Sequence, residues 1–118
     1  MLHKNRVWCV TDVDSAEKLA GILTEQTFTL CSGFRYGGYL FLNDSFSEDG
    51  AQEYGVIKEA TGKQVESITF SWCNYEEALR LVRDIARGDY DDQEWDGGID
   101  LTVQVQSPEQ HGTCPLCA

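Results

Sequence analysis

The chain has 118 residues, of which 42% are hydrophobic and 25% are charged. This length and composition suit one globular domain and exclude collagen-like and coiled-coil proteins. No apolar run approaches the roughly 18 residues that a membrane span needs, and the apolar stretch at residues 7–10 is shorter than a signal-peptide core of about 7–15 residues. We therefore expect a soluble cytoplasmic protein.

Acidic side chains outnumber basic ones by 20 to 9, which gives a net charge of −11. Residues 1–42 hold four of each sign, so residues 43–118 carry the whole excess. Such a negative field repels nucleic-acid phosphates and anionic membranes. It predicts no direct binding to either and favours a basic protein partner, although solubility alone would also account for it.

The first elements expected along the chain are a strand and a short helix. Residues 6–13 are rich in β-forming side chains. Asp14 followed by Glu17 is a capping-box pattern, which indicates that a helix begins there. The apolar residues of this helix recur at helical spacing and predict its buried face: Ala16, Leu19, Ala20 and Leu23.

Four strands are expected next, beginning at Thr27, Tyr39, Gln52 and Val65. Gly37 and Gly38 predict a tight hairpin turn between the first two, because two-residue hairpin turns need positive φ. The fourth strand, over residues 65–73, alternates most clearly. Its apolar side chains are expected on one buried face: Ile68, Phe70 and Trp72.

A second helix and a last strand complete the predicted elements. Asn74 and Glu77 form another capping-box pattern, and Gly88 is a natural helix end. The helix should bury Ala78, Leu81, Val82 and Ile85. Apolar residues then alternate with polar ones in the last strand: Ile99, Leu101, Val103 and Val105.

The order β-α-β-β-β-β-α-β predicts an α+β fold with a single mostly antiparallel sheet and two helices packed on one face. We expect the other face of the sheet to stay in water. Residues 1–106 are assigned to this single domain, and residues 107–118 to a polar C-terminal tail.

The sequence contains no recognisable catalytic constellation. The two histidines, His3 and His111, lie near the chain ends, without a nucleophile and an orienting acid in a known pattern. Phosphate-binding glycine loops and a Gly-x-Ser-x-Gly turn are missing as well. A binding protein is therefore favoured over an enzyme.

The acidic segment at residues 89–100 is the first candidate site, because it combines six carboxylates with two aromatic side chains and no base. Carboxylates around an aromatic ring attract Lys or Arg of a partner through charge and cation–π interaction. A solvated turn, aromatic side chains packed on their own domain, and an incomplete calcium loop are the alternatives. The partner-binding residues expected here are Asp89, Tyr90, Asp91, Asp92, Glu94, Trp95 and Asp96.

A second acidic segment, at residues 43–50, shows the same combination. The partner-binding residues expected here are Asp44, Phe46, Glu48 and Asp49. If the two segments lie at the same end of the sheet, they form one negative patch.

The tail carries a third candidate site, for a metal. His111, Cys114 and Cys117 have the His-x-x-Cys-x-x-Cys spacing of part of a zinc site, although a structural zinc needs four ligands. A reactive dithiol and an inert tail are the alternatives. The total of five cysteines is odd, which predicts reduced thiols rather than a disulfide framework.

Three functional hypotheses follow. The preferred one is a small acidic cytosolic binding module for a basic protein partner, acting as an inhibitor, an adaptor or an immunity-type factor. The second is a nucleic-acid mimic that blocks a DNA- or RNA-binding protein and would carry acids spaced along one surface. The third is a zinc- or thiol-dependent protein that uses the C-terminal Cys-x-x-Cys.

Overall fold

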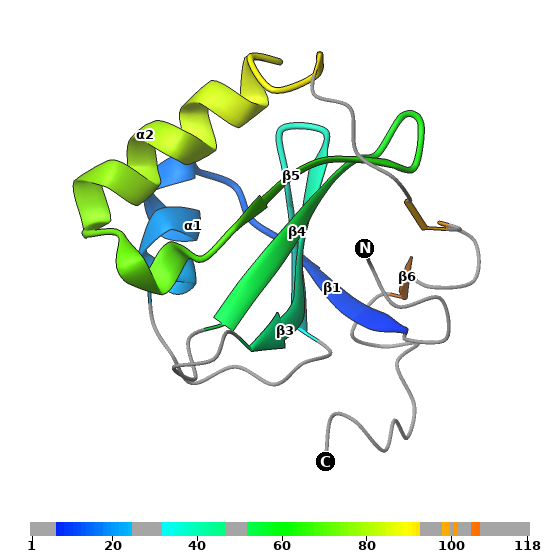
Figure 1. The fold of residues 1–118 in the computed structure, drawn as a ribbon, viewed down its shortest axis with the longest axis horizontal. Coiled ribbons are helices and arrows are strands. Elements are labelled where there is room, and N and C mark those ends of the chain that lie inside the picture. Colours follow the sequence, from blue (N-terminus) through cyan, green and yellow to red (C-terminus); the bar gives the residue numbers. More distant parts are fainter. Residues whose placement is uncertain are drawn as a thin grey trace.

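The computed structural model describes residues 7–24, 32–46, 52–92, 98–99, 101 and 105–106 (Figure 1). The elements follow one another in the predicted order, with one additional 3₁₀ turn, η1. They are β1 (Trp8–Asp12), α1 (Ala16–Leu23), β2 (Ser32–Tyr36), β3 (Tyr39–Phe46), β4 (Gln52–Lys58), β5 (Lys63–Ile68), η1 (Phe70–Trp72), α2 (Tyr75–Ala86) and β6 (Val105–Gln106). The predicted α+β fold is confirmed.

The strands form one sheet in the order β5-β4-β3-β2-β1-β6. Strands β2 to β5 make an antiparallel meander, whereas β1 runs parallel to both of its neighbours, β2 and β6. The sheet is therefore mixed. The reason lies in α1, which follows β1 and returns the chain to the end where β1 began, so that β2 must run in the same direction.

The β2–β3 hairpin has the turn that its glycines predict. Tyr36 pairs directly with Tyr39, and the two residues between them have positive φ angles of 60° at Gly37 and 86° at Gly38. A primed turn needs this backbone conformation, which side chains disfavour.

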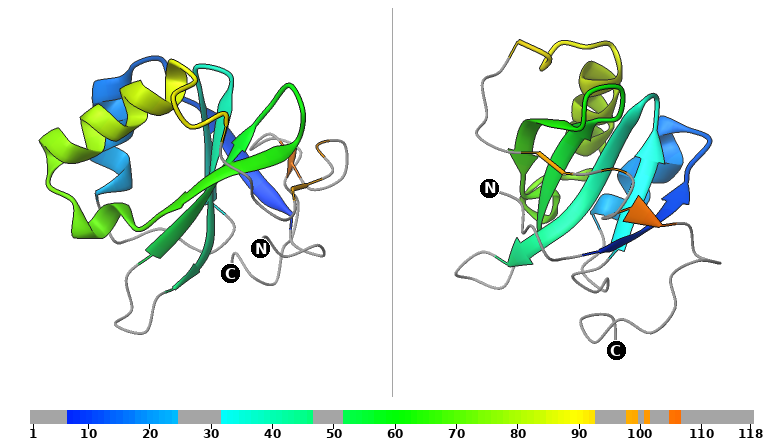
Figure 2. Two further views of the ribbon diagram at one scale, coloured as in Figure 1. Left: turned by 45° about the horizontal axis from the view of Figure 1, so that its top comes forward. Right: turned by 90° about the vertical axis from the view of Figure 1, so that its right-hand side faces the viewer.

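Both helices pack on one face of the sheet, as predicted (Figure 2). All four residues of the expected face of α1 are buried, and Ala78, Val82 and Ile85 of α2 join the same core. The caps differ slightly from expectation. Asn74 accepts a hydrogen bond from the backbone N–H of Glu77 at 2.8 Å, but α1 is capped by Ser15 instead of Asp14. Neither α1 nor α2, nor any other helix among the described residues, has the length and apolar character needed to cross a membrane.

The strand expected over residues 65–73 is shorter than predicted, because β5 ends at Ile68 and the chain then forms η1. The backbone N–H of Trp72 donates to the carbonyl of Thr69, and that of Cys73 donates to the carbonyl of Phe70. Side chains two residues apart do not share a face in a 3₁₀ turn. Phe70 is therefore buried, whereas Trp72 is 65% exposed, and its predicted place in the core is wrong.

The second face of the sheet is also buried, which corrects the expectation of a wet face. Five side chains form a core there: Trp8, Val10, Leu40, Leu42 and Ile57. Ile99, Leu101 and Val105 pack against them on the side away from the helices (Figure 2, left). Of the predicted last strand, Val105 lies in β6, Ile99 and Leu101 lie in no strand, and Val103 is outside the described residues.

The segment that closes this second face is held at the β4–β5 turn. The backbone N–H of Ile99 donates to the carbonyl of Gly62 at 2.9 Å, and Gly98 forms a bridge to Lys63. A Cβ atom at position 98 would collide with the carbonyl oxygen of Gly62, so only glycine allows this approach.

We predict that Ile85→Ala lowers the free energy of unfolding by about 2–5 kcal/mol, because it empties a site that is fully buried between α2 and the sheet. Leu81→Ala, at a half-buried position on the same helix, is the control and should cost less. Urea denaturation measures both losses. A loss below about 0.5 kcal/mol for Ile85→Ala would contradict this packing.

Candidate functional site

The described part of the first acidic segment, residues 89–92, begins directly after α2. Gly88 has a φ of 90°, and its N–H donates to the carbonyl of Ile85 at 2.9 Å, while the N–H of Asp89 donates to the carbonyl of Asp84. These bonds end the helix and turn the chain. The next residues reach the end of the sheet where β3 begins and β4 ends.

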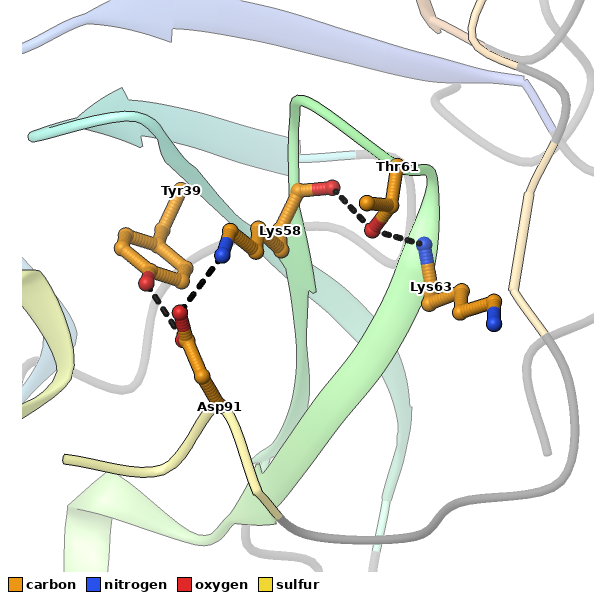
Figure 3. A network of polar contacts seen from close by, with 5 residues as sticks. All are labelled: Tyr39, Lys58, Thr61, Lys63 and Asp91. Carbon is orange, nitrogen blue, oxygen red and sulfur yellow. Dashed lines mark hydrogen bonds and ion pairs between the residues drawn. The ribbon is translucent and has the colours of Figure 1, made fainter. Parts of the chain in front are cut away.

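Asp91 joins its own segment to two strands, β3 and β4, at this end of the sheet (Figure 3). The hydroxyl of Tyr39, the first residue of β3, donates to one carboxylate oxygen at 2.5 Å. The ammonium of Lys58, the last residue of β4, lies 2.6 Å from the other. The Lys58 carbonyl also accepts hydrogen bonds from the β4–β5 turn, including the N–H of Gly62 at 2.9 Å. The carboxylate of Asp91 therefore fixes the acidic segment to the sheet.

The pKa shifts of Asp91 and Tyr39 indicate that these side chains hold the segment in place and do not perform acid–base chemistry. The hydrogen bond from Lys58, and then that from Tyr39, hold the pKa of Asp91 below its usual range. Burial, together with the Asp91 carboxylate, raises the pKa of Tyr39 to about 12. At neutral pH Asp91 is charged and Tyr39 keeps its proton, so the tyrosine is a hydrogen-bond donor and not a base.

Two more residues of this segment interact with their own domain. Tyr90 is half-buried and packs against the core between the helices and the sheet. Its pKa is raised, first by burial and then by the negative charge of Glu66. Asp89 pairs at 2.8 Å with Arg87, which also pairs with Asp84. Asp92 is exposed and has no ion pair within the part of the chain that the structure describes. The packing of Tyr90 on its own domain is one of the alternatives that the sequence left open, whereas the ion pair of Asp89 was not predicted. Partner binding by this segment stays a prediction.

The described part of the structure shows no contact between the remaining predicted partner-binding residues and residues 89–92. Glu94, Trp95, Asp96, Glu48 and Asp49 lie outside the described residues. Asp44 and Phe46 lie in strand β3.

The position of β3 also separates the two acidic segments. Because β3 begins at Tyr39 beside Asp91 and runs to Phe46, its far end lies about 23 Å away at the usual rise of a strand. The described end of the second segment, at residue 46, therefore lies toward the opposite end of the sheet from residues 89–92 of the first.

The predicted zinc ligands His111, Cys114 and Cys117 lie outside the described residues, so zinc binding stays a prediction. Among the residues that the structure does describe, no three His, Cys, Asp or Glu side chains gather closely enough to hold a metal ion. Cys9 and Cys73 are free thiols, and burial raises the pKa of each.

Ion pairs take up most of the described bases. Arg35 lies 2.7 Å from both Asp12 and Glu59, and Arg83 pairs with Glu17. With Lys58 and Arg87, these are four of the seven bases in the described ranges. Within those same ranges, four exposed acids form no ion pair: Asp14, Glu76, Glu77 and Asp92.

Sequence reasoning missed one surface feature, an exposed aromatic pair. Trp72 and Tyr75 are the large hydrophobic side chains that the described chain exposes, at 65% and 40%. The alternation of residues 65–73 concealed the 3₁₀ turn that exposes Trp72. Tyr75 lies one turn before Ala78 on the apolar stripe of α2, and no local sequence pattern shows that the buried part of the stripe begins only at Ala78.

Comparison of the chain with protein-family models, curated proteins and solved structures finds no match. The function is therefore inferred from the chemistry of the chain itself.

Asp91→Ala should lower the free energy of unfolding by about 1 kcal/mol at pH 7, because it removes two hydrogen bonds at a partly exposed site. Asp92→Ala removes an equal charge from an exposed neighbour and should change stability by less than about 0.5 kcal/mol. Urea denaturation of both variants tests the difference, and equal losses would show that the contacts of Asp91 do not stabilise the fold.

The stability lost in Asp91→Ala should also depend on pH. The folded pKa of Asp91 lies below the unfolded one, so its contribution is complete above the unfolded pKa of about 3.9 and disappears as the pH falls through the folded pKa. The gap between wild type and Asp91→Ala should therefore be constant from about pH 5 to 7 and narrow in stronger acid. A gap that widens on acidification would contradict this assignment.

Proposed function

We propose that this protein is a small acidic binding module that engages a basic protein partner in the cytoplasm, as an inhibitor, an adaptor or an immunity-type factor. The observation that carries the proposal is the net charge of −11, combined with the pairing of four of the seven described bases inside the domain. A partner therefore meets a surface whose unbalanced charge is negative.

A net charge of this size mainly affects the rate at which a partner associates and the choice between basic and acidic partners. A negative surface attracts basic partners over distances comparable to the Debye length and repels acidic ones. Close contacts then decide the affinity, and the salt dependence reports how many charges take part. The free thiols Cys9 and Cys73 are in keeping with a reducing compartment.

The arrangement of charge on α2 supports the binding module over a nucleic-acid mimic. A mimic needs acids spaced along one surface, as phosphates are spaced along a strand. The exposed residues of α2 instead combine Glu76 and Glu77 with two arginines, Arg80 and Arg83, and a third arginine, Arg87, is the C-cap of the helix. The bases interrupt any acidic row along this helix.

The test is capture of partners from the native host by the immobilised protein, at about 50 mM and about 500 mM salt. Basic proteins should bind at low salt and be largely lost at high salt, because added salt shortens the Debye length. The bound proteins are identified by mass spectrometry. Capture of acidic proteins alone, or capture that salt does not change, would contradict the proposal.

Two variants that change the charge in opposite directions make this test specific. Asp14→Asn, Glu76→Gln, Glu77→Gln and Asp92→Asn together remove the four exposed acids without an ion pair in the described chain, and we expect them to weaken capture. Lys18→Gln, Lys63→Gln and Arg80→Gln remove exposed bases instead and should leave capture equal or stronger. Equal losses in both variants would show that sign of charge does not select the partner.

A further inference from the structure

An exposed aromatic pair lies at the junction of η1 and α2, far from the acidic segment considered above. Trp72 and Tyr75 are three residues apart and are exposed at 65% and 40%. The residues on either side of the pair, Phe70 and Ala78, are fully buried. The exposure thus belongs to the two aromatic residues and not to a segment that has left the fold.

The backbone that carries this pair is fixed by its own hydrogen bonds. The N–H of Trp72 donates to the carbonyl of Thr69 at 3.1 Å, and the N–H of Cys73 donates to the carbonyl of Phe70 at 3.0 Å. Asn74 then caps α2 through the N–H of Glu77. Side chains presented from an ordered backbone lose less entropy on binding, so the pair is preorganised for a partner.

Two carboxylates follow the aromatic pair directly in the sequence. Glu76 and Glu77 are exposed in the first turn of α2, and neither forms an ion pair within the described ranges. The charge of Glu77 contributes to the raised pKa of Cys73, which places its carboxylate near the residue between Trp72 and the cap. The helix dipole accounts for acids at this end of a helix. It does not account for the exposed rings.

The combination selects the chemistry of the partner. Trp and Tyr are enriched among the residues that dominate binding energy at protein interfaces. A lysine ammonium also interacts with aromatic faces and carboxylates, but a guanidinium lies on rings more often and pairs with a carboxylate in a planar, two-pronged geometry that an ammonium cannot adopt. A surface that offers both rings and acids therefore favours arginine over lysine.

We propose that Trp72, Tyr75, Glu76 and Glu77 form a docking surface for an arginine-bearing segment of the basic partner. This inference rests on the proposed function, and it specifies the surface that binds the partner and the partner residue that is preferred. The surface lies at the start of α2, whereas residues 89–92 follow its other end, about 18 Å away along a helix of 12 residues (Figure 1). The two acidic regions are therefore separable by mutation.

The test uses two synthetic peptides of equal length and charge, one with four arginines and one with four lysines, each carrying a fluorescent label. Binding to the full chain is followed by fluorescence anisotropy. Wild-type protein should bind the arginine peptide several-fold more tightly. Trp72→Ala and Tyr75→Ala should each weaken it by about tenfold and remove the preference over lysine.

The charged residues have a different expected signature. Glu76→Gln with Glu77→Gln should weaken both peptides and flatten the salt dependence of binding. Asp89→Asn with Asp92→Asn removes the same number of acids beyond the other end of α2 and should change the arginine preference little. Trp72→Phe, which keeps a ring, should retain most of the binding, and unchanged circular dichroism and urea midpoints show that each variant is folded.

Each negative result of this experiment contradicts a different part of the two proposals. If wild type prefers arginine but neither Trp72→Ala nor Tyr75→Ala changes its affinity, the docking surface is overturned while the proposed function stands. If wild type binds both peptides equally, the arginine preference is overturned. If it binds neither peptide at low salt, the proposed attraction of basic partners fails together with the docking surface.

Discussion

Strand β3 directs Tyr39 and Phe41 to one face of the sheet and Leu40 and Leu42 to the other, and all four side chains are buried. A strand with two apolar faces must be covered on both sides. The helices α1 and α2 are enough for one side only. The remaining side depends on Ile99, Leu101 and Val105, so the segment after α2 forms part of a third layer.

This requirement also places the acidic segment. Asp91 contacts the helix side of the sheet through Tyr39, whereas Ile99 packs on the opposite side. Asp91 is held to Tyr39 and Lys58, and Ile99 is held to Gly62. The described residues on both sides of positions 93–97 of this acidic segment are thus each fixed to the sheet.

The local elements were predictable because their signals are local. The Asn74 cap, the apolar stripes of both helices and the Gly37–Gly38 turn each depend on residues within one or two turns of chain. The burial of the second face was missed, although an unbroken apolar run such as residues 39–42 is typical of a strand buried on both sides. The role of Asp91 had no sequence signal, because its partners Tyr39 and Lys58 are 52 and 33 residues away. Trp72 was misplaced because alternation continues past the residue where the strand ends.

The pairing of β1 with β6 sets an order of events during synthesis. Trp8 lies opposite Val105, so one edge of β1 has no partner until 97 further residues have been made. At about 5–20 residues per second, that edge stays open for roughly 5–20 s on the ribosome. Strands β2 to β5 have only near neighbours to find and can assemble in the meantime, because short-range pairing is fast. Strand β1, which precedes the other described strands in the chain, is thus among the last to be enclosed, and its open edge is available to other strands in the meantime.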